Sequence, residues 1–279
     1  MIKGKIVYEG RSKIFYESSE EGILIQHFKD NMRWLSQKKK EDSNPVIFGK
    51  GVLNNRISAY LMTQLDEIGL PTHFIKAINM REQLIWDIQM LPFQIVVRNL
   101  ASKEMEKRFG VEEGAHLPRS IVEFQLKNEK LTFPTISDEH IITFGWADQE
   151  ELEDIYHMAL RVNDFLTGLF LGLGLKLADV TLEFGRIYFQ GEPFIILGDE
   201  ICPDNCRLWR LDDKKELPKE NIGKDLNRDI KNYQEIARLL GLLPEGTLTP
   251  DTKVSTELLD KLKTANEGQM PIKPGPYKR

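Results

Sequence analysis

Three carboxylates, an arginine and a proline lie within one short segment of the chain, residues 199–207. The segment follows the apolar run 193–197, which is typical of a buried strand, so we expect its acidic residues at a strand end and in the loop beyond. Carboxylates in that position can hold Mg²⁺, a hard cation that also bridges to substrate phosphates. An arginine nearby supplies a planar donor fork for a phosphate or carboxylate. The alternative is a polar turn with a surface ion pair.

A second acidic segment, residues 179–185, lies just upstream and is expected to pair with the first. We predict Glu183 and Asp199 as metal ligands, because each has apolar neighbours among which an unpaired carboxylate would be costly. Asp179 is a further candidate on the same strand. For Glu183 and Asp199, the alternative is an ion pair with Arg98 or Arg207.

Two arginines are the candidate anion-binding residues. Arg98 ends the apolar strand 94–97, shortly before a helix start, where a phosphate can bind. Arg207 belongs to the acidic loop with Asp204, and we predict catalytic and substrate-binding roles for both. A buried pair of Arg207 and Asp204 that merely shapes the loop is the alternative.

A glycine hairpin near the N-terminus could bind a phosphate. Residues 4–17 alternate around Glu9 and Gly10, and Gly10 lets backbone N–H groups approach an anion closely. The predicted nucleotide-binding residues are Gly10, Arg11, Ser12, Lys13 and Lys127, and Lys13 is also predicted to be catalytic. A tight turn with surface cations would look the same. His73 is read as a packed histidine.

Composition excludes several classes of protein. The chain has 279 residues, a formal net charge of −5 and 41% hydrophobic residues. This composition is typical of a globular protein, and its negative charge argues against binding to nucleic acid or to an anionic membrane. Its two cysteines, Cys202 and Cys206, are too few for a disulfide framework and are read as structural thiols. We expect a cytoplasmic protein, and a homo-oligomer is left open.

The order of strands and helices favours an α+β protein with mostly antiparallel sheets. Apolar periodicity predicts long helices over residues 49–68, 148–171 and 226–240, with a shorter helix at 101–109. Strands are expected at 4–17, 22–28, within 72–100, and at 120–126, 175–184, 186–190 and 194–197. Residues 251–265 are read as one more helix. Three regions follow: 1–79 with the hairpin, 80–241 as the central part, and 242–279 as an extension and tail.

Several of these segments together resemble the SAICAR synthetase family, the phosphoribosylaminoimidazole-succinocarboxamide synthases. The run DEICPDNCRLW at 199–209 is similar to the family's DEISPD-x-CRLW, and residues 8–13 resemble its YEGKAK turn. Further matches in the same order are GKGVLNNRIS (49–58), THF (72–74), MREQL (80–84), VVRN (96–99), FGW (144–146), LRVNDFLTGLF (160–170) and LEFG (182–185). The chain is identified as a divergent member, matched from about residue 4 to 241.

The resemblance implies an ATP-dependent ligase that joins carboxyaminoimidazole ribotide to L-aspartate in purine biosynthesis. It implies Mg²⁺ and ATP, with small molecules as partners, and two or three abutting subdomains with a nucleotide cleft, as in ATP-grasp proteins. The hairpin would cover the triphosphate, Glu183 and Asp199 would hold the metal, and Arg98 would bind the ribotide phosphate.

Three positions depart from the family pattern. Glu104 stands where the family has a serine expected to touch the ribotide phosphate, Phe133 replaces an aspartate, and Thr181 replaces a lysine. Two alternatives therefore stay open: a ligase of the same fold acting on another carboxylate and amine, or a nucleotide-binding relative without ligase activity.

Overall fold

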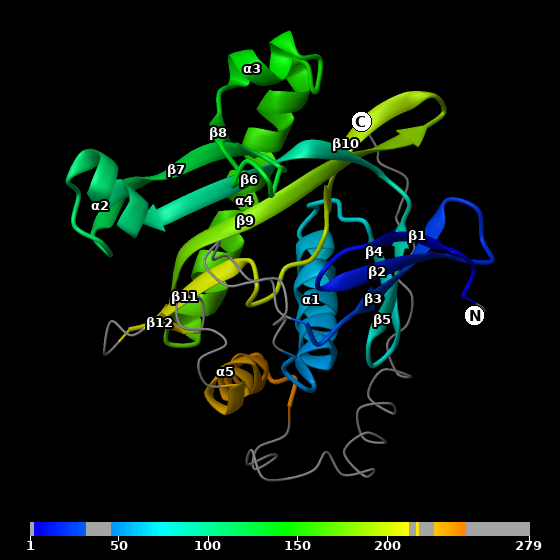
Figure 1. The fold of residues 1–279 in the computed structure, drawn as a ribbon, viewed down its shortest axis with the longest axis horizontal. Helices are drawn as coiled ribbons and strands as arrows, with labels where there is room; N and C mark the ends of the chain where they lie inside the picture. The colour runs from blue at the N-terminus through cyan, green and yellow to red at the C-terminus, as the bar shows by residue number, and fades with distance from the viewer. Residues whose placement is uncertain (1–2, 32–45, 212–215, 218–225, 244–279) are drawn as a thin grey trace. The chain divides into compact units, whose positions relative to one another are not determined.

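The structure is a computed structural model that describes residues 3–31, 46–211, 216–217 and 226–243 (Figure 1). Its backbone forms two compact units that interleave along the chain. The first unit comprises Met1–Ala59, Phe74–Asp87 and Leu226–Arg279, and the second comprises Tyr60–His73 and Ile88–Asp225. The contiguous boundaries after residues 79 and 241 stay a proposal, and most of the predicted extension, together with the helix expected at 251–265, lies outside the described residues.

The first unit contains a five-stranded antiparallel sheet in the order β1-β2-β3-β5-β4. Helix α1 begins in this unit and ends in the second. The elements are β1 (Ile6–Glu9), β2 (Lys13–Glu17), β3 (Ile23–Phe28), α1 (Lys50–Glu67), β4 (Phe74–Asn79), β5 (Glu82–Trp86) and α5 (Leu226–Leu239). The hairpin expected around Gly10 is therefore confirmed as β1 and β2.

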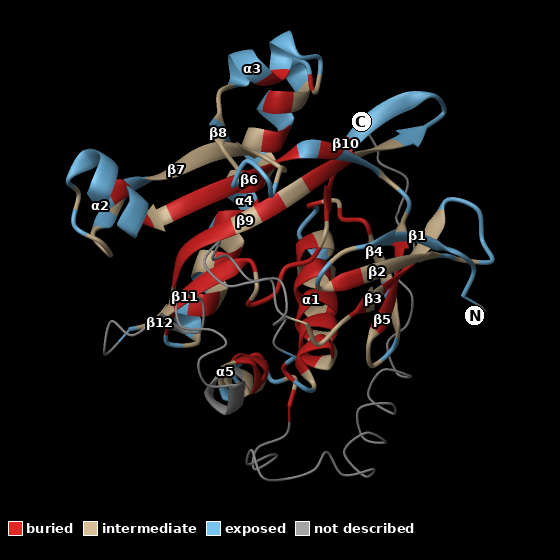
Figure 2. Cartoon of the chain, viewed as in Figure 1, coloured by how far each residue is buried: buried red, intermediate tan, exposed pale blue. Residues whose placement is uncertain are grey.

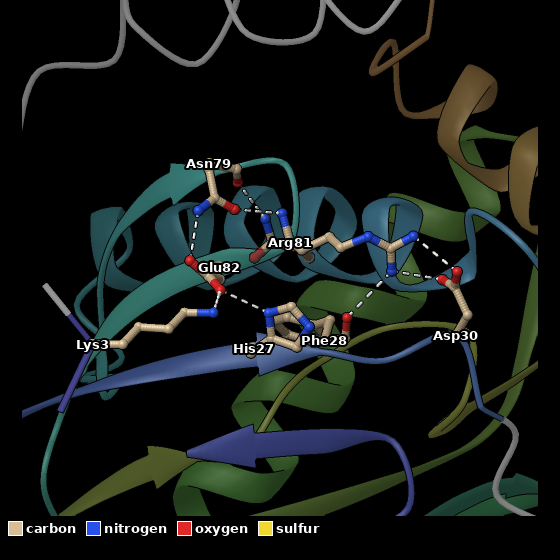
Figure 3. A network of polar contacts seen from close by, with 8 residues as sticks. Lys3, His27, Phe28, Asp30, Asn79, Arg81 and Glu82 are labelled. Carbon is tan, nitrogen blue, oxygen red and sulfur yellow. Dashed lines mark hydrogen bonds and ion pairs between the residues drawn. The ribbon is translucent and has the colours of Figure 1, made fainter. Parts of the chain in front are cut away.

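The start of α1 is fixed to the end of β3 by a half-buried ion pair of Asp30 with Arg81 (Figure 3). Asp30 accepts hydrogen bonds from Arg81 Nη1 at 2.7 Å, from Arg81 Nη2 at 2.8 Å and from the Gly51 backbone N–H at 2.9 Å. Burial raises the pKa of Asp30, but these donors outweigh it and hold the pKa below its ordinary value. A Cβ on Gly51 would lie 2.5 Å from the Phe28 carbonyl oxygen, so only glycine fits there.

The second unit is built on a larger antiparallel sheet in the order β12-β11-β9-β6-β7-β8, with β10 paired to the far half of β9. Helix α4 packs against β9 and β6. The elements are β6 (Gln89–Leu100), α2 (Lys103–Phe109), β7 (His116–Leu126), β8 (Thr135–Ile136), α3 (Asp138–Thr143), α4 (Gln149–Gly172), β9 (Leu175–Phe189), β10 (Glu192–Gly198), β11 (Cys206–Arg210) and β12 (Glu216–Leu217).

Helix α4 begins and packs as its sequence dictates. Asp148 and Glu151 form the predicted capping box, which satisfies two of the backbone N–H groups at the helix start. Ile155, Val162 and Leu166 are fully buried on one face of α4, and Figure 2 shows the matching buried stretch of β9 and β6 in red. The helix thus covers one side of the sheet and leaves the other side free to carry polar residues.

Two sequence expectations for this unit were wrong. The strands expected at 175–184 and 186–190 are one continuous strand, β9, because Gly185 is a site of close approach rather than a break: a Cβ there would lie 2.9 Å from the Gln89 carbonyl oxygen. The acidic loop is also shorter than expected, since Cys206–Arg210 forms β11 and pairs with β9. Arg207 therefore lies on a strand, and Arg98 lies within β6 rather than at its end.

The predicted α+β class with antiparallel sheets is confirmed, since every pairing between the described strands is antiparallel. Within the described ranges, no helix is both long and apolar enough to cross a membrane.

Candidate functional site

The predicted metal ligands lie on adjacent strands of the second unit. Glu183 of β9 is paired in register with Gly198 of β10, and Asp199 follows Gly198 directly. Asp199 has a left-handed backbone with φ 58°, a conformation that aspartate tolerates better than most residues. The side chain of Glu183 is 14% exposed. The sequence prediction that the two acidic segments pair is therefore confirmed, and their pairing brings the two carboxylate positions together.

Glu183 is bound by Lys127, a residue predicted to bind nucleotide. Lys127 Nζ donates a short hydrogen bond to Glu183 Oε2, and the backbone N–H of Lys127 donates to the Pro92 carbonyl oxygen at 2.9 Å. The structure thus gives Glu183 an ion-pair partner that the sequence did not indicate, since the alternative weighed for Glu183 was a pair with Arg98 or Arg207. Lys127 therefore places a cation beside one of the two predicted metal ligands.

His73 contacts the same site and was set aside from the sequence as a packed histidine. It is 2% exposed, and its Nε2 lies 2.6 Å from the Asp199 carbonyl oxygen. Because a carbonyl can only accept, Nε2 carries the proton in this contact. The backbone N–H of His73 also donates to the Leu197 carbonyl oxygen at 2.8 Å. His73 therefore packs as predicted and in addition holds the backbone of a predicted metal ligand, a pairing across 126 positions that sequence spacing could not indicate.

The two candidate anion-binding arginines share one carboxylate. Arg98 Nη1 lies 3.3 Å and Arg207 Nη2 lies 2.7 Å from Asp179 Oδ2, and Arg98 Nε donates to Glu123 Oε2 at 2.7 Å. Arg207 thus forms an ion pair with Asp179, a carboxylate other than the Asp204 of the alternative reading. An oxygen shared by two guanidiniums is less available to a metal, and a metal-binding role of Asp179 stays a prediction.

The turn before β11 is held by its asparagine. Asn205 Oδ1 accepts from the Cys202 backbone N–H at 2.8 Å, and Asn205 Nδ2 donates to the Glu200 carbonyl oxygen. Cys202 and Cys206 are buried and form no disulfide, as expected of structural cysteines. Asp204 lies in this turn and is half-buried.

The predicted phosphate hairpin lies in the first unit. The Gly10 N–H donates to the Lys13 carbonyl oxygen at 2.9 Å, which closes the turn around Arg11 and Ser12. Lys13 is 9% exposed. Lys29, which the sequence reading missed, adds a cation to this turn, because its Nζ donates to Glu9 Oε1 at 2.8 Å and to the Gly10 carbonyl oxygen at 3.1 Å.

The donor set suits Mg²⁺ better than a transition metal. Across the described part of the chain, no group of three or more His, Cys, Asp and Glu side chains is arranged to hold a metal ion. Mg²⁺ uses one or two carboxylates and completes its shell with water and substrate phosphates, so the two carboxylates of Glu183 and Asp199 are sufficient for that pattern.

The three departures from the family pattern lie in different settings. Glu104 is on the surface of α2, where its side chain is 63% exposed and pairs with Arg108 at 3.5 Å. Thr181 lies on β9 between Asp179 and Glu183, and Phe133 has a positive φ of 50° in the loop after β7.

Comparison with known proteins identifies the family of this chain. The SAICAR synthetase family model matches residues 6–239. The chain belongs to the SAICAR synthetase family. A phosphoribosylaminoimidazole-succinocarboxamide synthase of Rhodospirillum centenum is 51% identical over 245 residues, 88% of this chain and 95% of the relative. The synthase of that name from Sinorhizobium medicae is 50% identical over the same shares of the two chains.

Solved structures of the family have the same fold. The phosphoribosylaminoimidazole-succinocarboxamide synthase of Ehrlichia chaffeensis is 38% identical, has a TM-score of 0.79, and the match covers 86% of this chain and 100% of that one. A SAICAR synthetase solved in complex with ADP is 34% identical with a TM-score of 0.76, and the match covers 85% and 99% of the two chains.

Proposed function

We propose that this protein is a phosphoribosylaminoimidazole-succinocarboxamide synthase, which condenses carboxyaminoimidazole ribotide with L-aspartate at the expense of ATP in purine biosynthesis. The observation that carries the proposal is an identity of 51% with a relative of that name along 88% of the chain. At that similarity a ligase for a different carboxylate and amine, or a relative without ligase activity, is not favoured.

ATP as co-substrate is supported by the family member solved with ADP. Glu183 and Asp199 would hold Mg²⁺, which supplies charge neutralisation at the triphosphate when bound. Lys127, ion-paired with Glu183, brings a cation to the same place. In the first unit, the backbone of Gly10, Arg11 and Ser12 with the side chain of Lys13 would cover the triphosphate.

Arg98 and Arg207 would bind the ribotide phosphate, because two guanidiniums held near one carboxylate present several donors to an anion. Asp204, in the turn before Arg207, is the candidate for contact with the ribotide or with the amino group of aspartate. These residue roles follow from the family motif at each position and from the contacts described above.

The reaction is a carboxylate activation followed by amide formation. The ribotide carboxylate attacks the γ-phosphorus of ATP, its oxygen forms the new bond, and ADP leaves. The aspartate amine then attacks the resulting acyl phosphate, loses a proton and expels inorganic phosphate. Arg98 and Arg207 would position the ribotide through its phosphate, and Lys13 and Lys127 would supply the fixed positive charge that stabilises the charge developing on the transferring group.

A coupled ADP-release assay tests the function. We expect ADP release to require ATP, the ribotide and L-aspartate together, so that omission of any one abolishes it, and we expect SAICAR as the product by mass. Repeated turnover of ATP to ADP without aspartate, or with another amine in its place, would contradict the proposal. A cytoplasmic location and a homo-oligomeric state are further proposals, to be checked by fractionation and sedimentation.

A further inference from the structure

Asp179 lies where charged side chains from three neighbouring strands of the second unit meet. Strand β9 lies between β6 and β11, and Asp179 is the register partner of Arg98 on one side and of Arg207 on the other. All three residues are buried, with exposed fractions of 4% for Asp179, 9% for Arg98 and 6% for Arg207. A single oxygen, Asp179 Oδ2, lies 3.3 Å from Arg98 Nη1 and 2.7 Å from Arg207 Nη2.

Two guanidiniums this close repel each other, and burial strengthens the repulsion because little water screens it. A carboxylate shared between them offsets that repulsion and also fixes direction, since the donors of a guanidinium radiate from a rigid plane. Arg98 is held at two points, by Glu123 at Nε and by Asp179 at Nη1, which sets the orientation of its plane. Arg207 Nη2 forms an ion pair with the same Asp179 oxygen at 2.7 Å, a contact that has the distance but not the geometry of a hydrogen bond.

We propose that Asp179 is a positioning residue that holds Arg98 and Arg207 as a preformed pair for the phosphate monoester of the ribotide. The inference rests on the proposed function, in which both arginines bind that phosphate. It adds that the spacing and orientation of the pair are set by Asp179, so that phosphate recognition depends on a carboxylate that itself repels phosphate.

The direction in which phosphate affinity changes on replacement of Asp179 distinguishes two possible roles of this residue. If Asp179 were only a counter-charge, replacing it with asparagine would remove a negative charge near the phosphate and tighten binding. If Asp179 positions the arginines, the same replacement weakens binding, because asparagine offers one neutral oxygen in place of a shared anionic one. The two roles thus predict changes in opposite directions.

The experiment compares two inhibitors on the full-length wild type and Asp179→Asn: the product ribotide SAICAR and its riboside, which lacks the phosphate. We expect Asp179→Asn to raise the inhibition constant of the ribotide by about tenfold or more, as for loss of a charge-assisted hydrogen bond. The riboside constant and the KM for ATP should change by less than about twofold, since neither ligand uses the phosphate subsite.

Glu123→Gln is the matched control, because Glu123 belongs to the same cluster but its ion pair in the structure is with Arg98 alone. Its effect on the ribotide should be smaller than that of Asp179→Asn. Asp179→Glu keeps the charge and displaces it, so it should also weaken the ribotide selectively. This second variant keeps the test decisive if the asparagine variant does not fold.

Ribotide binding that is unchanged or tighter in Asp179→Asn, or an equal loss for ribotide and riboside, would overturn the positioning role. A wild-type enzyme that condenses its substrates but gives these results leaves the proposed function standing and refutes the positioning role alone. A wild-type enzyme that does not condense them refutes the proposed function, and the ratio of the two inhibition constants then still tests whether the arginine pair recognises a phosphate.

Discussion

Glu82 is predicted to be a main electrostatic contributor to the stability of the first unit. Its carboxylate is bound by three donors: His27 Nδ1 at 2.7 Å, Asn79 Nδ2 at 2.6 Å and the ammonium of Lys3 (Figure 3). Burial raises the pKa of Glu82, but the hydrogen bonds from His27, Lys3 and Asn79 outweigh burial and lower the pKa from 4.5 to about 2. The perturbation is Glu82→Gln, which keeps the shape and removes the charge.

The sign follows from proton linkage. The folded-state pKa lies below the unfolded one, so the carboxylate contributes its stability above the unfolded value of 4.5 and loses it as the pH falls toward 2. A depression of this size corresponds to at most about 3.5 kcal/mol of unfolding free energy. Lys3 is 38% exposed, and solvent screening of its contact reduces the figure, so we expect Glu82→Gln to cost about 1–2 kcal/mol near neutral pH.

Urea unfolding of the wild type and Glu82→Gln across the acid range measures the effect. The difference between the two proteins should be largest near neutral pH and should shrink as the pH falls below 4.5. Glu9→Gln is the control, because Glu9 also pairs with a lysine in this unit but is 52% exposed, and it should cost less than about 0.5 kcal/mol. A Glu82→Gln deficit that persists undiminished in acid, or a Glu9→Gln deficit of equal size, would refute the reasoning.

Three further predictions concern the proposed reaction. Glu183→Gln and Asp199→Asn should each abolish ATP-dependent turnover across a Mg²⁺ titration while circular dichroism stays unchanged; turnover at the wild-type rate would exclude the metal role. Lys13→Met should weaken ATP binding more than ribotide binding in calorimetry, and an unchanged ATP affinity would make the hairpin a structural turn. Glu104→Ser should tighten ribotide binding by no more than about 0.5 kcal/mol, because Glu104 is 63% exposed, and the gain should vanish at high salt.

The elements that local rules govern could be predicted from the sequence. Helix α4 is set by its apolar period and by the capping box of Asp148 and Glu151, both of which act within a few residues. The strand break predicted at Gly185 was wrong, because a glycine in a strand marks either a break or a close approach of another backbone. Only the neighbouring strand decides which of the two occurs. Strand β11 was missed because its pairing with β9 lies outside the segment itself.

The candidate site shows the same limit. Glu183, Asp199, Arg98 and Arg207 could be chosen from the sequence by residue type and position, but the pairs of Glu183 with Lys127 and of both arginines with Asp179 depend on strand register and were not predicted. Arg98 and Asp179 are separated by 81 positions, and no local pattern connects them. Which side chains could do chemistry was therefore predictable, whereas which side chains neutralise one another was not.

Strand β9 explains how one sheet serves both the core and the site. Alternate residues Val180 and Leu182 are buried toward α4, so Asp179, Thr181 and Glu183 share the opposite face of the strand. The family pattern has a lysine where this chain has Thr181, between the two carboxylates.

Here each of those carboxylates forms an ion pair with a residue of another segment. Asp179 pairs with the arginines of β6 and β11, and Glu183 pairs with Lys127, which follows β7. The charge balance of the face therefore does not depend on a cation at position 181. Replacement of the lysine by Thr181 removes a positive charge without leaving a buried carboxylate unpaired, which is the costly outcome. This departure is compatible with an intact arrangement of the anion-binding and metal-binding residues on β9 and its neighbours.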